Sequence, residues 1–410
     1  MDMNQRVVII GAGPAGCVVA SLLAMRGRAV LMFDVDKRPP LIVGESLLPA
    51  CVPLLRTLGV EEEVKACSIF KPGASLTCDD DLYPFGFSAA QGQAPSYSYN
   101  VPRDQFDAIL RGAALRHGAH IERHRATLEP DGEGGVRLAG ESLRIAEDFF
   151  GAAPDMFVDA TGRHALVERT LGLDSDLGTR NDVALFAHLD QACLEEAGHI
   201  HVDRLERGWS WRIPLQGKTS VGVVISRDHL PEYGDTAQEQ YDRLLATSPR
   251  LAARVEGAQR LTPVVKYTNY QRHAARLHGP NWTLVGDAAG FVDPVFSTGV
   301  YLALRGAELA AHAMLSDRPD AREAYQSEWL GELRRWRRII DHWYDGRLLA
   351  LLNVGAVMSR APGGKLVDRH VSKHVTRIFT GEAGARSYSR KLLNFLLPLG
   401  RMTQRHYAIS

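Results

Sequence analysis

The sequence predicts an α/β fold that begins with a parallel sheet, and two observations carry this prediction. The first is an apolar run at residues 6–10 that leads directly into Gly11-Ala-Gly13-Pro-Ala-Gly16. The second is an apolar stretch from Cys17 to Met25, followed by another apolar run from Ala29 to Phe33 that ends at Asp34. This order of strand, turn, helix and strand is the βαβ unit of dinucleotide-binding proteins, in which glycines admit a pyrophosphate and the acid holds a ribose hydroxyl. The alternative is a turn that only packs helix on strand. The candidate nucleotide contacts are Gly11, Gly13, Ala15, Gly16 and Asp34.

Length and composition limit the classes of protein that the chain can belong to. At 410 residues it is longer than one ordinary domain, so two or three packed units are expected. The 48 Lys and Arg residues balance the 48 Asp and Glu residues, which gives no net charge to attract nucleic acid or an acidic membrane. The five cysteines lack metal-ligand spacing, and the longest apolar run, residues 348–358, is shorter than the ~20 residues of a membrane span. The polar N-terminus does not read as a signal peptide, so we expect a cytoplasmic protein without a metal, a nucleic-acid partner or a membrane span.

Four further segments suggest which nucleotide is bound. Residues 44–46 read Gly-Glu-Ser, residues 101–107 read Val-Pro-Arg-Asp-Gln-Phe-Asp, residues 157–163 predict a strand with a polar turn, and residues 282–290 predict another strand-to-helix junction. Each alone is compatible with ordinary turn chemistry. Their order resembles that of the flavoprotein monooxygenases and halogenases with a glutathione-reductase-like FAD-binding fold, over about residues 6–345. The resemblance implies FAD rather than NAD, with contacts from Glu45, Ser46, Arg103, Gly286 and Asp287, the last of them at the ribitol.

The same resemblance divides the chain into three regions. The FAD-binding domain is expected to be discontinuous, with segments 1–66, 101–180 and 263–325. Segments 67–100 and 181–262 are expected to form a sheet-containing substrate domain, and residues 326–410 a helical C-terminal region. Within these regions, residues 219–225 predict a strand and residues 129–135 a hairpin turn.

Residues 209–214, Trp-Ser-Trp-Arg-Ile-Pro, alternate bulky apolar side chains with polar ones. On a strand, Trp209, Trp211 and Ile213 would point to one face. The pattern Trp-x-Trp-x-Ile-Pro, which closes at Pro214, resembles the hallmark of the flavin-dependent halogenases. Beside a flavin, such a wall would keep an organic substrate away from the ring, so that a small oxidant has to pass it. The alternative is that two tryptophans merely share the buried face of a sheet.

Residues 291–299 precede an apolar helix that is expected to start near Val300. The backbone N–H groups of such a turn, with the positive end of a helix dipole behind them, form a site for an anion. The resemblance to halogenases implies that chloride or bromide binds the amides of Thr298 and Gly299. The alternative, typical of hydroxylases, is a loop that only cradles the pyrimidine edge of the flavin.

Lys71 matches by position the essential lysine of the halogenases, although by itself it would read as a solvated turn residue. The resemblance implies that reduced FAD and O2 form a hydroperoxide, that halide attacks its distal oxygen, and that the resulting hypohalous acid is relayed to this lysine. The lysine would then hydrogen-bond the acid or carry the halogen as a haloamine. The second variant needs a neutral amine, yet a lysine with a pKa of about 10.4 is neutral only about once in 2,500 at pH 7. Desolvation would increase that fraction.

Phe296 stands where the tryptophan halogenases of this family have a glutamate that helps to take the ring proton. The resemblance therefore argues against free tryptophan and favours activated rings such as phenols and pyrroles. Many enzymes of that kind act on acyl groups attached to a carrier protein.

A C-terminal segment bears on that attachment. Trp329, Trp336 and Trp343 recur every seven residues with Leu333 and Ile340 between them, which predicts a helix with one apolar face. Four arginines crowd around this face, at positions 334, 335, 337 and 338. The helix either docks on the FAD-binding domain with a solvated basic edge, or its arginines bind an acidic carrier protein.

Taken together, the sequence predicts a halogenase that uses FADH2, O2 and chloride or bromide on an electron-rich aromatic, free or attached to a carrier protein. The reduced flavin would come from a separate flavin reductase, and the product would belong to antibiotic or pigment biosynthesis. The runner-up is an NAD(P)H-dependent aromatic hydroxylase of the same fold, which the wall of Trp209 and Trp211 disfavours. A flavin-dependent reductase of an unsaturated lipid and a non-catalytic flavoprotein are further alternatives.

Overall fold

The computed structural model describes residues 5–35, 39, 41–79, 81–358, 373–382 and 407–409. Its first sheet has five parallel strands in the order β16-β10-β1-β2-β7. They are β1 (Arg6–Ile10), β2 (Ala29–Phe33), β7 (His120–Glu122), β10 (Met156–Asp159) and β16 (Trp282–Leu284). Strands β1 and β2 are almost entirely apolar because both faces of such a parallel sheet are covered. Both have the bounds that the sequence predicts.

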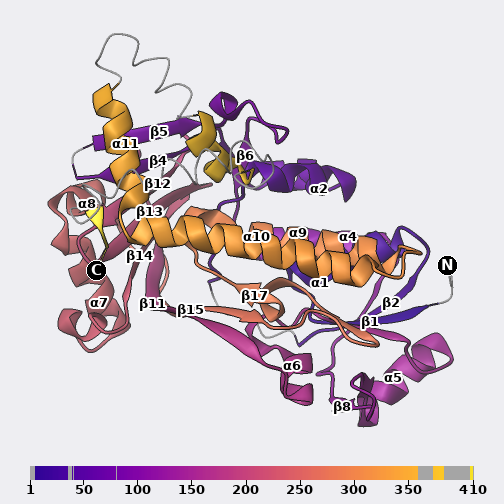
Figure 1. Cartoon of the computed structure of the whole chain (residues 1–410). Helices are drawn as coiled ribbons and strands as arrows, with labels where there is room; N and C mark the ends of the chain where they lie inside the picture. The colour runs from indigo at the N-terminus through magenta and orange to yellow at the C-terminus, as the bar shows by residue number, and fades with distance from the viewer. Residues whose placement is uncertain are drawn as a thin grey trace.

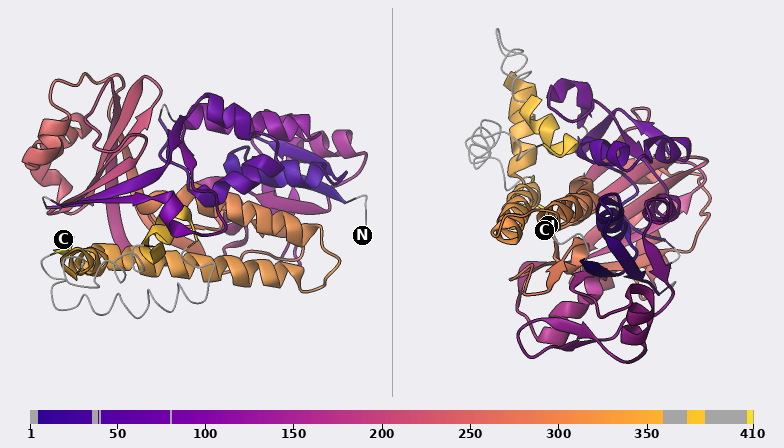
Figure 2. Two further views of the ribbon diagram at one scale, coloured as in Figure 1. Left: turned by 90° about the horizontal axis from the view of Figure 1, so that it is seen from above. Right: turned by 90° about the vertical axis from the view of Figure 1, so that its right-hand side faces the viewer.

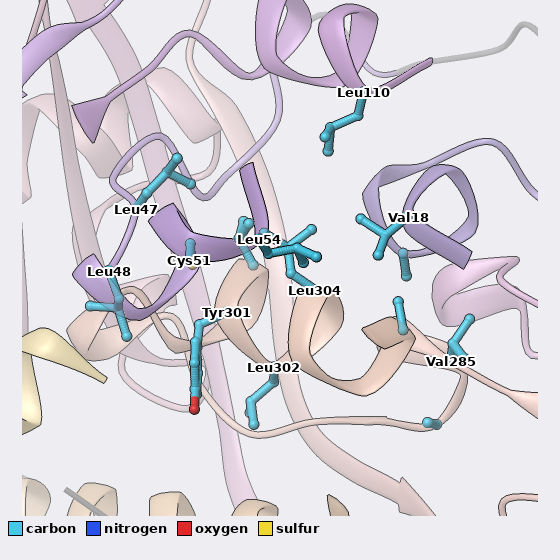
Figure 3. Close-up of a cluster of buried hydrophobic side chains, with 14 of the residues drawn as sticks. Val18, Leu47, Leu48, Cys51, Leu54, Leu110, Val285, Tyr301, Leu302 and Leu304 are labelled. Atoms are coloured by element: carbon cyan, nitrogen blue, oxygen red, sulfur yellow. The ribbon is translucent and has the colours of Figure 1, made fainter. Parts of the chain in front are cut away.

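Helices pack beside this sheet and bury a large apolar core. The helix after the glycine-rich turn, α1 (Pro14–Ala24), packs against α4 (Arg103–Arg116) and α9 (Thr298–Met314). Helix α10 (Ala321–Tyr344) lies along α9 (Figure 1). Figure 3 shows part of the core, where Val18, Leu54, Leu110 and Leu304 are contributed by four different helices.

The second sheet has eight strands in the order β17-β15-β11-β14-β13-β12-β4-β5. Its neighbouring strands are antiparallel except for the parallel pair of β4 and β12. The strands are β4 (Gly73–Cys78), β5 (Asp81–Gly86), β11 (Ser175–Leu189), β12 (Ile200–Leu205), β13 (Gly208–Leu215), β14 (Lys218–Ser226), β15 (Val265–Ala274) and β17 (Gly290–Phe291). The predicted strand at 219–225 is therefore confirmed as β14.

One face of this second sheet carries its own small core. Helices α7 (Ala237–Thr247) and α8 (Pro249–Arg254) pack on it, with Val223, Tyr241 and Leu244 among the buried residues. Both helices lie at the end of the molecule opposite the N-terminus (Figure 2). The other face of the sheet is turned toward the glycine-rich turn after β1 and supplies part of the cavity described below.

Shorter elements complete the described fold. The helices are α2 (Val52–Thr57), α3 (Glu61–Ala66), α5 (Gly140–Phe150), α6 (Leu166–Leu171) and α11 (Arg347–Met358). Two antiparallel pairs join β3 (Ile69–Lys71) to β6 (Ser98–Asn100) and β8 (Leu128–Pro130) to β9 (Val136–Leu138). The pairing of β8 with β9 confirms the hairpin turn predicted at 129–135.

The structure corrects one predicted element. The sequence predicts a strand-to-helix junction at residues 282–290, but β16 is followed by a 3-10 turn, η5 (Gly286–Ala288), that leads into β17. Strand β17 pairs with His273 and Arg272 of β15, so tertiary pairing at the sheet edge replaces a local helix. The helix of this region, α9, starts only at Thr298, close to the predicted position. Although residues 263–325 were assigned to the FAD-binding domain, β15 and β17 belong to the eight-stranded sheet, and the division into domains stays a prediction.

The C-terminal region is helical where it is described. It contains most of α10, all of α11 and a helical stretch at 373–380, whereas residues 359–372 and 383–406 lie outside the described residues. Within the described part of the chain, no helix combines the length and the hydropathy needed to cross a membrane.

Candidate active site

A cavity of about 770 Å³ lies between the two sheets. Its walls include the turns that follow β1, β2, β10 and β16, at the carboxyl ends of the parallel strands, and the inward face of β13. Ligands of open α/β sheets bind at this edge. The predicted residues on the cavity wall are Gly11, Gly13, Ala15, Asp34, Glu45, Ser46, Arg103, Trp209, Trp211, Ile213, Gly286, Asp287 and Gly299. Four predicted residues are not on it: Gly16, Lys71, Pro214 and Thr298.

The three glycines of the first turn have different structural roles. Gly11 has a φ of +103°, and a Cβ there would lie 2.4 Å from the backbone oxygen of Ala160. A Cβ on Gly16 would lie 2.0 Å from the backbone oxygen of Gly11, so this glycine allows α1 to pack closely on the turn and does not face the cavity. A Cβ on Gly13 would meet no atom within 4 Å. The open space beside Gly13, at the N-terminus of α1, is a cradle that fits a pyrophosphate.

Polar groups around the cavity fit the rest of a flavin dinucleotide. The Asp34 carboxylate accepts hydrogen bonds from the Ala12 amide at 3.3 Å and the Arg111 guanidinium at 2.7 Å. The Ser46 hydroxyl is buried on the wall and has no hydrogen-bond partner among the described residues. Desolvation raises the pKa of Asp287, while the nearby Arg163 and Arg103 lower it. The cradle, the unpartnered hydroxyl and the two acids on the wall therefore fit FAD, whose ribose Asp34 would hold and whose ribitol Asp287 would hold.

His188 of β11 is a cavity neighbour that sequence reasoning missed. Its Nε2 lies 2.7 Å from Oε1 of Glu45, and both side chains are buried. The pair ties the 44–46 loop to the second sheet. No motif surrounds His188, so only the pairing of distant segments in the fold could have revealed it.

The Trp-x-Trp-x-Ile-Pro segment lies on β13, and the predicted alternation is confirmed. Trp209, Trp211 and Ile213 face the cavity. Arg212 points to the opposite side of the sheet, where its Nε donates to Asp203 at 3.2 Å. The two indole rings lie 5.7 Å apart between centroids, and Gly222 of the neighbouring strand leaves room for Trp211, since a Cβ there would be 2.2 Å from its ring. The tryptophans thus form a continuous apolar wall, and Pro214 is buried at its end without reaching the cavity.

Lys71 is not a solvated turn residue. It ends β3 with a relative exposure of 1%, its Nζ donates to the carbonyl oxygen of Leu47 at 2.9 Å, and the Phe87 ring lies 5.3 Å away. Desolvation lowers the pKa of Lys71 from 10.5 to about 7. Lys71 is not on the cavity wall. Its hydrogen bond to the carbonyl oxygen of Leu47, the residue that follows Ser46, holds it just behind that wall.

The loop before α9 is held in an uncommon conformation. Phe296 and Ser297 have φ values of 62° and 59°, although neither is glycine. Asp293 braces the loop, because its Oδ1 accepts from the Val295 amide at 2.9 Å and its backbone oxygen accepts from the Thr298 hydroxyl at 2.9 Å. Helix α9 begins at Thr298, so the amides of its first turn have no partner within the helix. Gly299 reaches the cavity wall and Thr298 does not.

The C-terminal helix α10 has the predicted apolar face. Trp329, Trp336 and Trp343 are all buried against the core. On its outer side, Arg334 and Arg338 are exposed, whereas Arg335 and Arg337 are half-buried. The exposed arginines form a pair one turn apart.

Known proteins match this chain over most of its length. The model of the tryptophan halogenase family matches residues 6–94 and 87–347. A tryptophan 2-halogenase of Chondromyces crocatus is 32% identical in an alignment of 369 residues that covers 84% of this chain and 69% of the relative. A 1H-pyrrole-2-carbonyl peptidyl-carrier-protein chlorinase of Pseudomonas fluorescens is 29% identical, covering 84% of this chain and 83% of the relative.

Solved structures share the fold of this chain. A flavoprotein/dehydrogenase of Cytophaga hutchinsonii superposes with a TM-score of 0.81 at 25% identity, covering 98% of this chain and 99% of that one. The myxobacterial chondrochloren halogenase superposes with a TM-score of 0.74 at 28% identity, covering 83% and 82% of the two chains.

Proposed function

Because this chain belongs to the tryptophan halogenase family and is a flavin-dependent halogenase, we propose that it halogenates a phenol or a pyrrole through Lys71. The enzyme uses FAD in its reduced form, O2 and a halide, as the halogenases of this family do. When bound, reduced FAD supplies two electrons toward the reduction of O2, and the halide supplies two more.

The burial of Lys71 is the observation that carries this proposal. Desolvation lowers the pKa of Lys71 to about 7, so a far larger share of its amine is neutral at pH 7 than the roughly one in 2,500 of a solvated lysine. A neutral amine can take a halogen from hypohalous acid as a haloamine, and a charged one can donate a hydrogen bond to the acid. The site makes both forms available at neutral pH.

The other residues have roles that follow from their places. The wall of Trp209, Trp211 and Ile213 lines the cavity. It separates an aromatic substrate from the flavin. The amides of Thr298 and Gly299 hold the halide at the start of α9. The wall disfavours the hydroxylase alternative, which requires the substrate to lie against the flavin.

Phe296 determines the class of substrate that we propose. Its ring packs edge-on against Trp343 with 5.5 Å between centroids, and no carboxylate stands at this position to take a ring proton. A ring that is already electron-rich needs less assistance. The carrier-protein chlorinase among the relatives and the exposed Arg334 and Arg338 support a substrate attached to a carrier protein, with reduced flavin delivered by a separate reductase.

The test is a product assay with the purified enzyme, FAD, a flavin reductase with NADH, bromide and O2. The substrate panel contains phenol and pyrrole carboxylates, a pyrrolyl carrier protein and free tryptophan, and mass spectrometry detects the products. We expect a monobrominated phenol or pyrrole that disappears when bromide is omitted. Hydroxylated products would contradict the halogenase, and preferential bromination of free tryptophan would contradict the substrate class.

A further inference from the structure

Tyr344, the last residue of α10, connects two parts of the site that lie far apart in the sequence. Its hydroxyl oxygen accepts a hydrogen bond from Nε1 of Trp209 at 3.0 Å and donates to Oδ2 of Asp293 at 3.1 Å. All three side chains are buried. A phenol has one proton to donate, so this hydroxyl gives its proton to Asp293 and accepts the proton of the indole.

The far end of this chain of hydrogen bonds reaches the strained loop. Asp293 uses its second oxygen, Oδ1, to hold the Val295 amide at 2.9 Å, immediately before the two residues with positive φ. Conformations of this kind persist only where the surroundings impose them. Tyr344 therefore supports the carboxylate that supports the loop.

The tyrosine itself is fixed from two further directions. The guanidinium of Arg180 lies over its ring, with Cζ 3.4 Å from the ring centroid, and Asp182 holds that guanidinium through bonds of 2.7 and 2.9 Å. The preceding residue, Trp343, packs against Phe296 inside the loop. Helix α10 runs along α9 and ends at the second sheet (Figure 1), where Tyr344 is buried.

We propose that Tyr344 is a positioning residue that fixes the Trp209 ring and the 292–297 loop relative to each other. The inference rests on the proposed function, in which Trp209 belongs to the wall and the first amides of α9 hold the halide. Without the hydroxyl, the indole loses its hydrogen-bond partner and the Asp293 carboxylate loses one of the groups that hold it. The wall and the halide site would then move independently, and oxidising equivalents would escape as peroxide instead of reaching the substrate.

The test is Tyr344→Phe, which removes the hydroxyl and keeps the ring under Arg180. Hydrogen–deuterium exchange, measured without FAD or halide, should be about threefold to tenfold faster in peptides that cover residues 292–299, as loss of one buried hydrogen bond allows. In turnover, we expect a higher KM for bromide and less brominated product per flavin oxidised, with an unchanged Kd for FAD. Exchange and product yield equal to wild type would overturn the inference.

The matched control is Tyr241→Phe, which removes a buried hydroxyl that donates to the Val221 carbonyl at 3.1 Å on the far face of the second sheet. A general loss of stability would affect both variants, whereas only Tyr344→Phe should change the product per flavin. If Tyr344→Phe does not fold, Trp209→Phe tests the same contact: product per flavin should fall while loop exchange stays at the wild-type rate, and an unchanged yield would refute the proposal. Because the exchange experiment needs no turnover, a wild-type enzyme that makes no halogenated product would refute the proposed function separately.

Discussion

At the scale of single residues, the environment of Lys71 decides its chemistry. Lys71 lies at the end of β3 and is buried, with the Leu47 carbonyl and the Phe87 ring beside its amine. The sequence supplies the lysine and its resemblance to the family, but not the tertiary contacts that surround it. Burial is what brings the pKa of Lys71 to about 7, and two predictions follow from it.

Lys71→Met keeps the apolar stem and removes the amine. We expect halogenation to fall by about 100-fold or more, in the range of a lost acid–base group, while FAD binding stays at the wild-type level because Lys71 is not on the cavity wall. Product formation by mass spectrometry and a flavin titration measure the two quantities. The matched control is Lys65→Met, at a lysine that is 60% exposed, which should leave both unchanged. Near wild-type halogenation by Lys71→Met would show that the lysine has another role.

The lowered pKa of Lys71 also predicts how stability depends on pH. Between pH 7 and about 10.5 the unfolded chain binds a proton on this lysine that the folded chain does not, so its contribution to the free energy of unfolding rises with pH. The stability advantage of Lys71→Met over wild type should therefore shrink as pH increases, by up to about 1.4 kcal/mol per pH unit. Urea unfolding at pH 7, 8 and 9 measures the difference. A difference that is constant across this range would mean that Lys71 keeps an ordinary pKa.

At the scale of elements, two glycines of the turn between β1 and α1 have different roles, Gly13 in cofactor binding and Gly16 in packing. A side chain on Gly13 would enter open space in the cradle, whereas one on Gly16 would collide with the turn itself. We expect Gly13→Val to fold with wild-type stability and to weaken FAD binding by about tenfold or more, since the valine occupies the place of the pyrophosphate. Gly16→Val should instead destabilise the protein. Flavin titration and thermal unfolding distinguish the two outcomes, and tight FAD binding by Gly13→Val would place the cofactor elsewhere.

The start of α9 gives a second prediction at this scale. Bromide should bind the amides of Thr298 and Gly299, where the helix dipole is positive and the first turn has no internal partners. Anomalous diffraction from a crystal grown with FAD and bromide locates the ion directly. Ordered FAD with no bromide peak at these amides would exclude the assigned halide site.

Elements with a local sequence signal have the predicted structure, whereas elements that depend on pairing between distant segments do not. The strands at 6–10 and 29–33 follow from local apolar runs, and β13 follows from its alternation, so these elements have the predicted bounds or faces. The helix expected after Gly286 does not form, because β17 pairs with β15 from another part of the chain. The left-handed Phe296 and Ser297 carry no local signal either, since glycine and asparagine are the residues that favour that conformation.

At the scale of the whole molecule, α10 links the parts of the site. It packs along α9 and ends at the wall strand β13. The spacing of three tryptophans at every seventh residue predicts the apolar face of α10. The contacts of this helix with β13 and with the 292–297 loop depend on tertiary structure. Its outer side remains exposed, and there Arg334 and Arg338 present two positive charges to solvent.

Charge reversal on this outer side tests whether the substrate arrives on a carrier protein. The double variant Arg334→Glu and Arg338→Glu should lower turnover of a pyrrolyl carrier protein by about tenfold and leave a small free pyrrole unaffected, because exposed cations chiefly raise the rate of association with an acidic partner. Added salt should lower the wild-type rate on the carrier protein in the same way, since exposed charges are screened over about 8–10 Å. The matched control reverses Arg137 and Arg144, which are 63% and 71% exposed on β9 and α5. Equal losses on both substrates would indicate a folding defect, and an unchanged rate on the carrier protein would mean that this edge of α10 is only a solvated face.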